Sequence, residues 1–148
     1  MNTTNKTTSD ALQSLTTIAQ EVANIQNSFS GKNQEDAKAL LIELTSLHLA
    51  FIDERRIVEA NAHAQVTELN NRINSFKETL SGLSSDASLN QNEIKTVKNN
   101  IRQASNELES LNSRTEKNDL FMDDLISTIT NTSTAIHQYL KSDSVTAA

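Results

Sequence analysis

Residues 94–139 read IKTVKNNIRQASNELESLNSRTEKNDLFMDDLISTITNTSTAIHQY. Within this stretch, fourteen seam positions follow one another at alternating spacings of three and four residues, and eleven of them are apolar or aromatic. The seam consists of Ile94, Val97, Ile101, Ala104, Leu108, Leu111, Thr115, Asn118, Met122, Leu125, Ile129, Thr132, Ile136 and Tyr139. A heptad repeat sustained over this length is typical of a coiled-coil helix. The stretch therefore predicts one long helix over residues 90–141.

A second long helix is predicted over residues 34–80. Its first part has a broad apolar face formed by Leu40, Leu41, Leu44, Leu47, Leu49, Phe51 and Ile52. Its second part has a single seam formed by Ala62, Val66, Leu69, Ile73, Phe76 and Leu80. The link SGLSSDAS, residues 81–88, contains Gly82 and several turn formers. Because this link is short, the two helices are expected to fold back on each other as an antiparallel hairpin.

A shorter helix is predicted over residues 10–29, with Asp10 as its N-cap and Gly31 in the left-handed position after its end. One face of this helix carries Leu12, Leu15, Ile18, Val22, Ile25 and Phe29. With the hairpin turn centred near residue 85, the broad apolar face meets the apolar end of the last helix, and the first helix can cover both. We therefore expect an all-α fold: an elongated antiparallel helical hairpin of coiled-coil type, with a shorter N-terminal helix packed on one end.

These three helices are predicted to form one helical domain over residues 10–141. Residues 1–9 (MNTTNKTTS) are predicted to form a disordered polar leader, and residues 142–148 a flexible tail. The leader has no apolar core region of the kind found in Sec signal peptides, so any export is expected to follow a route that needs no signal peptide.

The composition of the chain excludes several classes of protein. The 148 residues include no Pro, no Cys and no Trp, and only two Gly. A disulfide framework, a Cys-based metal site and a thiol nucleophile are therefore excluded. The net charge is −6 and no basic run is present, which argues against nucleic-acid binding. No apolar stretch reaches the length of a transmembrane span, and membrane contact is not expected.

No catalytic or cofactor site is predicted. The three histidines, His48, His63 and His137, form neither a Glu-x-x-His nor a His-x-x-x-His pair, so helical metal-site patterns are missing. Neighbouring carboxylates such as Asp123 and Asp124 point about 100° apart on a helix and cannot act together as acid and base. We predict no catalytic residue, no cofactor and no metal, and hence no enzyme.

We predict interaction roles for a small set of residues. Arg55 and Arg56 either recognise a carboxylate on a partner or pair within the chain, with Glu59 or with Glu116 and Asp119 across the hairpin; the intrachain pairing is favoured. Asn118, together with Thr115 and Thr132, is predicted to fix the register of the seam. The remaining candidates are Phe121, Met122 and Leu125, which belong to the core of the three-helix end in preference to an exposed patch.

In composition and layout the chain resembles the extracellular filament and translocator proteins of bacterial type III secretion systems. The resemblance rests on the Thr/Asn-rich leader, the missing Cys, Trp and Pro, the segment LLIELTSLHLAFIDERRIVEANAHAQ (residues 40–65), and the long Ser/Thr/Asn-rich heptad helix at the end. The chain lacks the large insert of many filament subunits and the hydrophobic hairpin of the membrane-inserting translocators. No catalytic or binding residue follows from this resemblance.

The leading hypothesis is a non-enzymatic, self-assembling structural protein. Its partners would be further copies of itself, as a homo-oligomer or filament, or another helical protein. A secreted filament or secretion-apparatus component is the most concrete form. One alternative is an intracellular, cytoplasmic coiled-coil adaptor or export chaperone that presents an amphipathic face to a client helix. A further alternative is a soluble subunit of a helical pore-forming toxin.

Overall fold

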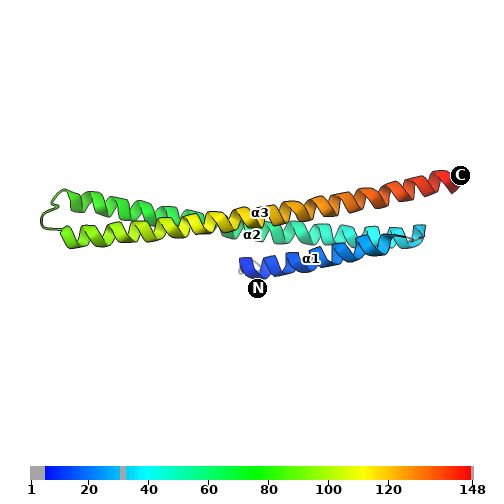
Figure 1. Cartoon of the computed structure of the whole chain (residues 1–148), viewed down its shortest axis with the longest axis horizontal. Coiled ribbons are helices and arrows are strands. Elements are labelled where there is room, and N and C mark those ends of the chain that lie inside the picture. The colour runs from blue at the N-terminus through cyan, green and yellow to red at the C-terminus, as the bar shows by residue number, and fades with distance from the viewer. Residues whose placement is uncertain (1–5, 31–32, 148) are drawn as a thin grey trace. The chain divides into compact units, whose positions relative to one another are not determined.

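The computed structural model describes residues 6–30 and 33–147, with side chains up to residue 142. These residues form three α-helices and no strand (Figure 1). Helix α1 spans Thr8–Phe29, α2 spans Gln34–Ser84 and α3 spans Gln91–Ala147. The prediction of an all-α protein is confirmed. Gly31, for which a left-handed conformation is predicted, lies outside the described residues, as do residues 1–5 of the predicted leader.

Helix α1 begins before the predicted N-cap. Thr7, in extended conformation, is the N-cap, and its Oγ1 accepts a hydrogen bond from the backbone N–H of Asp10 at 3.0 Å. Asp10 therefore lies in the first turn, where its negative charge favours the positive end of the helix dipole. The prediction of Asp10 as the N-cap is wrong: Thr7, also of a residue type favoured at N-caps, takes this position three residues earlier and accepts the hydrogen bond from Asp10 N–H.

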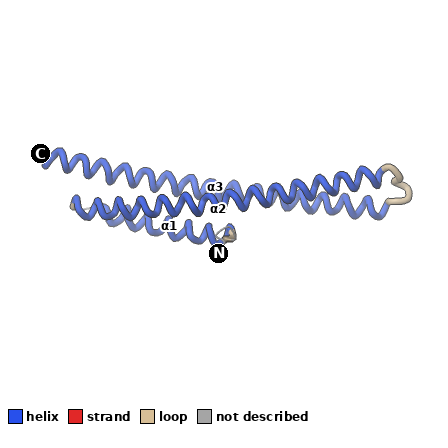
Figure 2. The backbone as a smooth tube through the Cα atoms, turned by 180° about the vertical axis from the view of Figure 1, so that it is seen from behind, coloured by secondary structure: helices blue, strands red, loops and turns tan. Residues whose placement is uncertain are grey.

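Helix α2 ends four residues later than predicted, and Gly82 lies inside it. An interior Gly costs about 1 kcal/mol relative to Ala, which weakens a helix without ending it. The helix ends where side chains satisfy its last carbonyls: Ser85 Oγ donates to the carbonyl of Gly82 at 2.7 Å, and Asn90 Nδ2 donates to that of Leu83 at 3.2 Å. Figure 2 shows the resulting turn between α2 and α3 in tan.

The chain divides into two compact units. The three-helix unit consists of Met1–Glu59 and Asp119–Ala148, and the two-helix unit consists of Ala60–Asn118. In the three-helix unit, α1 packs on parts of α2 and α3 of its own chain around one apolar cluster. Its buried members are Ala11, Leu15, Ile18, Val22, Ile25, Ala37, Leu44, Leu47, Phe51, Val58, Met122, Leu125, Ile129 and Ile136.

The two-helix unit has a much thinner core. Residues 60–84 of α2 and 91–118 of α3 run side by side in opposite directions, as both views show (Figures 1 and 2). Its buried apolar residues are Leu69, Ile73, Val97, Ala104 and Leu111. Further seam residues are only half-buried, namely Val66, Phe76, Leu80, Ile94, Ile101 and Leu108. Seam residues of this unit are covered by one neighbouring helix only, and the half-buried ones keep part of their surface in contact with solvent.

The heptad seam of α3 is the buried face of that helix. All fourteen predicted positions are buried or half-buried. The broad face of α2 is only partly buried, since Leu49 and Ile52 are exposed; the expectation that these two residues face the core is wrong. At its end, α3 continues to Ala147, so the backbone of residues 142–147, for which a flexible tail is predicted, is helical.

Candidate interaction surfaces

Arg55 of α2 makes contacts within its own chain. Its Nη2 donates to Asp123 Oδ1 on α3 at 2.9 Å, and its Nε donates to Glu59 Oε2 at 3.5 Å. The guanidinium also lies over the ring of Phe51, 5.9 Å from the centroid, as in a cation–π contact. Partial burial of the Arg55 guanidinium disfavours its charged form and by itself lowers the pKa. The hydrogen bond to Asp123 and the negative charges of Asp123 and Glu59 have a larger, opposite effect, so the pKa of Arg55 is raised. Arg55 is therefore committed to an intrachain network.

Arg56 differs from its neighbour in both exposure and contacts. Its side chain is exposed on α2, and within the described part of the chain no ion pair involves it. The favoured prediction of an intrachain pair therefore holds for Arg55 with Glu59. On α3, however, the carboxylate that pairs with Arg55 belongs to Asp123 and not to Glu116 or Asp119. Of the two arginines, Arg56 is the one whose guanidinium is open to a partner.

The other predicted interaction residues lie on inward-facing positions. Met122 and Leu125 are buried in the cluster of the three-helix unit, and Phe121 is half-buried and packs against that cluster. Asn118 is a half-buried seam residue. Thr132, the buried polar residue of the same seam, donates its hydroxyl proton to the carbonyl of Thr128 at 2.7 Å. Phe121, Met122 and Leu125 thus support the core and do not form an exposed patch.

A surface that sequence reasoning missed lies on the outer side of α2. We call it the outer stripe, and its apolar members are Ile42, Leu49 and Ile52, which are 70%, 61% and 39% exposed. With Thr45, these positions are spaced three, four and three residues apart, which places them on one helix face. The inner residues Leu44, Leu47 and Phe51 face the core from the opposite side of the same helix. A search for a second heptad phase within 34–59 would have found the stripe.

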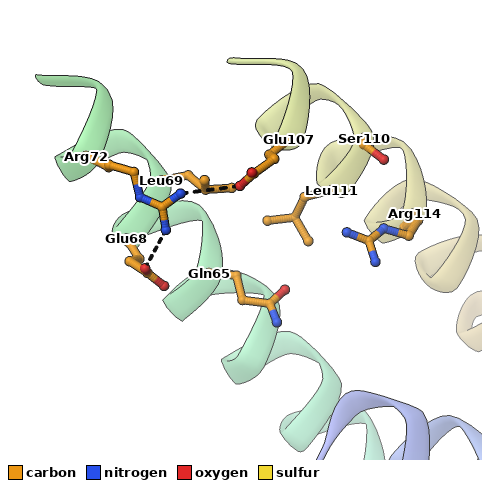
Figure 3. A pocket seen from close by; sticks show the side chains of 8 residues that line it. All are labelled: Gln65, Glu68, Leu69, Arg72, Glu107, Ser110, Leu111 and Arg114. Carbon is orange, nitrogen blue, oxygen red and sulfur yellow. Dashed lines mark hydrogen bonds and ion pairs between the residues drawn. The ribbon is translucent and has the colours of Figure 1, made fainter. Parts of the chain in front are cut away.

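A charged cavity of about 360 Å³ lies in the two-helix unit between residues 65–72 and 107–114. Figure 3 shows Arg72 at one side, bonded to Glu68 at 2.8 Å and to Glu107 at 3.4 Å, and Arg114 at the other. Leu69 and Leu111, both buried, contribute apolar surface to it. The cavity is a hollow on the flank of the helix pair, lined by both signs of charge around an apolar floor.

A polar contact joins the start of the described chain to the middle of α2. Lys6 Nζ donates to Glu54 Oε1 at 2.5 Å and to Ser14 Oγ at 3.2 Å. The second carboxylate oxygen, Glu54 Oε2, is buried and has no hydrogen-bond partner among the described residues. A buried oxygen without a donor costs free energy, and the Lys6 ammonium at Glu54 Oε1 offsets part of that cost.

The described residues contain no cluster of three or more His, Asp or Glu side chains that could hold a metal ion. Across residues 6–30 and 33–147, no helix is both long enough and apolar enough to cross a membrane. Comparison with protein-family models, with curated proteins and with solved structures gave no match. The surfaces described above are therefore the basis for a functional proposal.

Proposed function

We propose that this protein is a non-enzymatic structural protein that self-assembles through its helical surfaces. The observation that carries the proposal is the thin core of the two-helix unit, residues 60–118, in which several apolar seam residues are only half-buried. Two helices that bury one narrow seam remove little apolar area from water per residue, so such a pair is marginally stable alone. Packing against the same unit of further copies would cover the half-buried seam residues and supply the missing burial.

In this proposal residues 60–118 form an elongated antiparallel coiled coil that packs laterally. The heptad spacing of α3 and the narrow seam of α2 support it, because helices with heptad seams associate in twos, threes or fours according to the residues of the seam. The cavity near Arg72 and Arg114 would accept side chains from the neighbouring copy. Its apolar floor and mixed charges match a helical partner of the same composition.

The most concrete form of the proposal is a secreted filament subunit or secretion-apparatus component of the type III kind. The support is the polar leader and the absence of Cys, Trp and Pro, which suit export through a narrow channel. Deletion of residues 2–5 tests the export route, since it spares the contacts of Lys6 and Thr7. We expect release from a host with a type III apparatus to be lost while helicity is retained; unchanged release would exclude this segment as the export signal.

Self-assembly is tested by sedimentation velocity of the wild-type protein over a wide concentration series, followed by negative-stain microscopy of the largest species. We expect the mean mass to rise with concentration, and a monomer at every concentration would overturn the proposal. The role of the cavity in assembly is tested by Ser110→Arg, because the introduced side chain fills the cavity from an exposed position. We expect this variant to assemble less well than the wild type. Asn71→Arg, also exposed and outside the cavity lining, is the control and should assemble like the wild type.

A further inference from the structure

We infer that a row of four charges on α3 joins two copies of this chain, with α3 of one copy antiparallel to α3 of the other. The charged row, as we call it, consists of Lys95, Arg102, Glu109 and Glu116. The inference deepens the proposed function and rests on it, because it names one surface and one orientation by which residues 60–118 pack laterally.

The first argument is the order of the charges along the row. Its members are seven residues apart, so they lie along one line of α3. All four are exposed, and none of them forms an ion pair with another described residue. The two cations come first and the two carboxylates follow, so the row is complementary to itself when it is read in the opposite direction.

A twofold axis midway along the row pairs every charge with its opposite. In such a pairing residue i meets residue j and j meets i. Lys95 comes level with Glu116 of the second copy and Arg102 with Glu109, which gives four layers of opposite charge. A parallel pairing in register sets each charge beside its own kind, and a parallel pairing shifted by whole heptads brings opposite charges level in at most two layers. The charge order therefore selects the antiparallel orientation.

The second argument is which side of the helix pair carries the row. The polar residues that line the cavity each come directly before a seam residue, and they are Gln65, Glu68, Arg72, Glu107, Ser110 and Arg114 (Figure 3). Residues that come directly after a seam residue lie on the other flank, because successive residues advance by about 100° around a helix. The charged row belongs to this second flank, as do Thr67, Asn70, Asn74 and Lys77 of α2. The pairing therefore leaves the cavity free for a further copy.

The residues between the row and the seam fit the same register. They are Lys98, Ser105 and Asn112, all of them exposed. Lys98 comes level with Asn112 of the second copy, whose amide oxygen can accept a hydrogen bond from the ammonium group, and Ser105 comes level with itself. On this flank of α3, the register brings no two like charges level.

The third argument is the apolar surface beside the row. In the two-helix unit, the apolar seam residues of α3 that are buried are Val97, Ala104 and Leu111. Those that are only half-buried are Ile94, Ile101 and Leu108, and each comes directly before a member of the charged row. In the proposed register Ile101 comes level with Leu108 of the second copy. The pairing therefore covers apolar surface that one copy alone leaves in contact with water, which is favourable.

The size of the flank is close to that of a stable interface. From Ile94 to Glu116, α3 is about 33 Å long, and two helices side by side are about 20 Å wide. The face therefore measures about 660 Å², against about 800 Å² per partner in a standard interface. Because exposed ion pairs supply much of the attraction, association is expected to weaken as salt is added.

The test reverses the charge of one member of the row at a time. Arg102→Glu or Glu109→Arg sets like charges together in both central layers, and we expect either variant alone to associate at least tenfold more weakly than the wild type. An equimolar mixture of the two should associate as tightly as the wild type, because each copy supplies the charge that the other lacks. Sedimentation velocity of the full-length proteins measures association, and circular dichroism verifies the helix content.

The matched controls are Lys38→Glu and Glu78→Arg. They make the same changes of charge at exposed positions outside the charged row, and neither residue forms an ion pair with another described residue. We expect both control variants to associate like the wild type, alone and mixed.

Orientation is tested by disulfide formation, because the chain has no Cys of its own. Mixing the single variants Lys98→Cys and Asn112→Cys should give mainly the mixed disulfide. A parallel pairing in register would instead link each variant to itself and overturn the antiparallel arrangement.

The outcomes for the wild type and the reversed variants distinguish the charged row from self-assembly in general. If the wild type associates and Arg102→Glu and Glu109→Arg associate as it does, the charged row is excluded and self-assembly stands. If these two variants lose association and their mixture does not recover it, the pairing of row with row is wrong. If the wild type stays monomeric at every concentration, both proposals fail.

Discussion

Arg55 and Asp123 lie 68 residues apart in the chain and are joined by a hydrogen bond of 2.9 Å. The pair connects α2 to α3 inside the three-helix unit, and the ring of Phe51 lies beneath the guanidinium. Glu59 holds the same guanidinium from one turn along α2. Because three groups share one cation, its position is better defined than that of an isolated surface pair.

The first prediction contrasts the two neighbouring arginines. Arg55→Met should lower the free energy of unfolding by about 0.5–1.5 kcal/mol, because the ion pair and the cation–π contact are lost while the stem still packs. Arg56→Met should change it by less than about 0.5 kcal/mol, as is usual for an exposed side chain. Urea unfolding monitored by circular dichroism measures both. Equal effects would mean that the Arg55 network contributes nothing to stability.

The second prediction contrasts the two sides of α2. Leu44 is 1% exposed in the core, so Leu44→Ala should cost about 2–5 kcal/mol through lost burial and the remaining cavity. Leu49→Ala, on the outer stripe, should cost less than about 0.5 kcal/mol at a concentration where the chain is monomeric. Thermal and urea unfolding give the values. A large loss for Leu49→Ala in the monomer would place Leu49 in the core.

The third prediction concerns Lys6 and Glu54. Lys6→Met should destabilise the protein by about 1–3 kcal/mol, because it leaves a largely buried carboxylate without its cation. Glu54→Gln in the Lys6→Met background should recover part of this loss, since a neutral amide costs less to bury. A double-mutant cycle of unfolding free energies measures the interaction, and additive effects of the two substitutions would argue against a direct contact.

The fourth prediction concerns Gly82, which is helical and has open space where a Cβ would lie. Gly82→Ala should raise the free energy of unfolding by about 0.5–1 kcal/mol, because Ala loses less backbone freedom on folding than Gly. Ser85→Ala is a useful companion, since it removes the hydroxyl that satisfies the carbonyl of Gly82 and should act in the opposite direction. Destabilisation by Gly82→Ala would indicate that α2 ends before residue 82.

The sequence predicts the three helices and the buried seam of α3 well, because hydrophobic periodicity directly reports which face of a helix is covered. It predicts the pairing of α2 with α3 less well. Glu116 or Asp119 is expected opposite Arg55, and Asp123 is found there. The difference arises because α2 continues through Gly82 to Ser84, which moves the centre of the turn toward α3. Each residue of α2 therefore lies opposite a residue of α3 that is about one helical turn further along the chain than predicted. Side-chain capping by Ser85 and Asn90 decides that endpoint.

The outer stripe shows a second limit of sequence reasoning. Leu49 and Ile52 are apolar and lie among core residues in the chain, so composition assigns them to the same broad face as Leu44 and Phe51. Which side of α2 is covered depends on where α1 and α3 pack, and these are contacts between distant segments. The local pattern contains the heptad spacing of both faces but does not say which of the two is filled within one chain.

The division of the chain has a consequence for the order in which the protein folds during synthesis. The two-helix unit, Ala60–Asn118, is one continuous segment, whereas the three-helix unit takes its residues from both ends of the chain. Domains generally fold as units as they emerge from the ribosome. Residues 60–118 can therefore pair once residue 118 has emerged, whereas Leu15, Leu44 and Ile129 can meet only after the later residue 129 has emerged as well. Until then, the apolar faces of α1 and α2 are without the helix that completes their core, so this nascent stage is where a chaperone has most to protect.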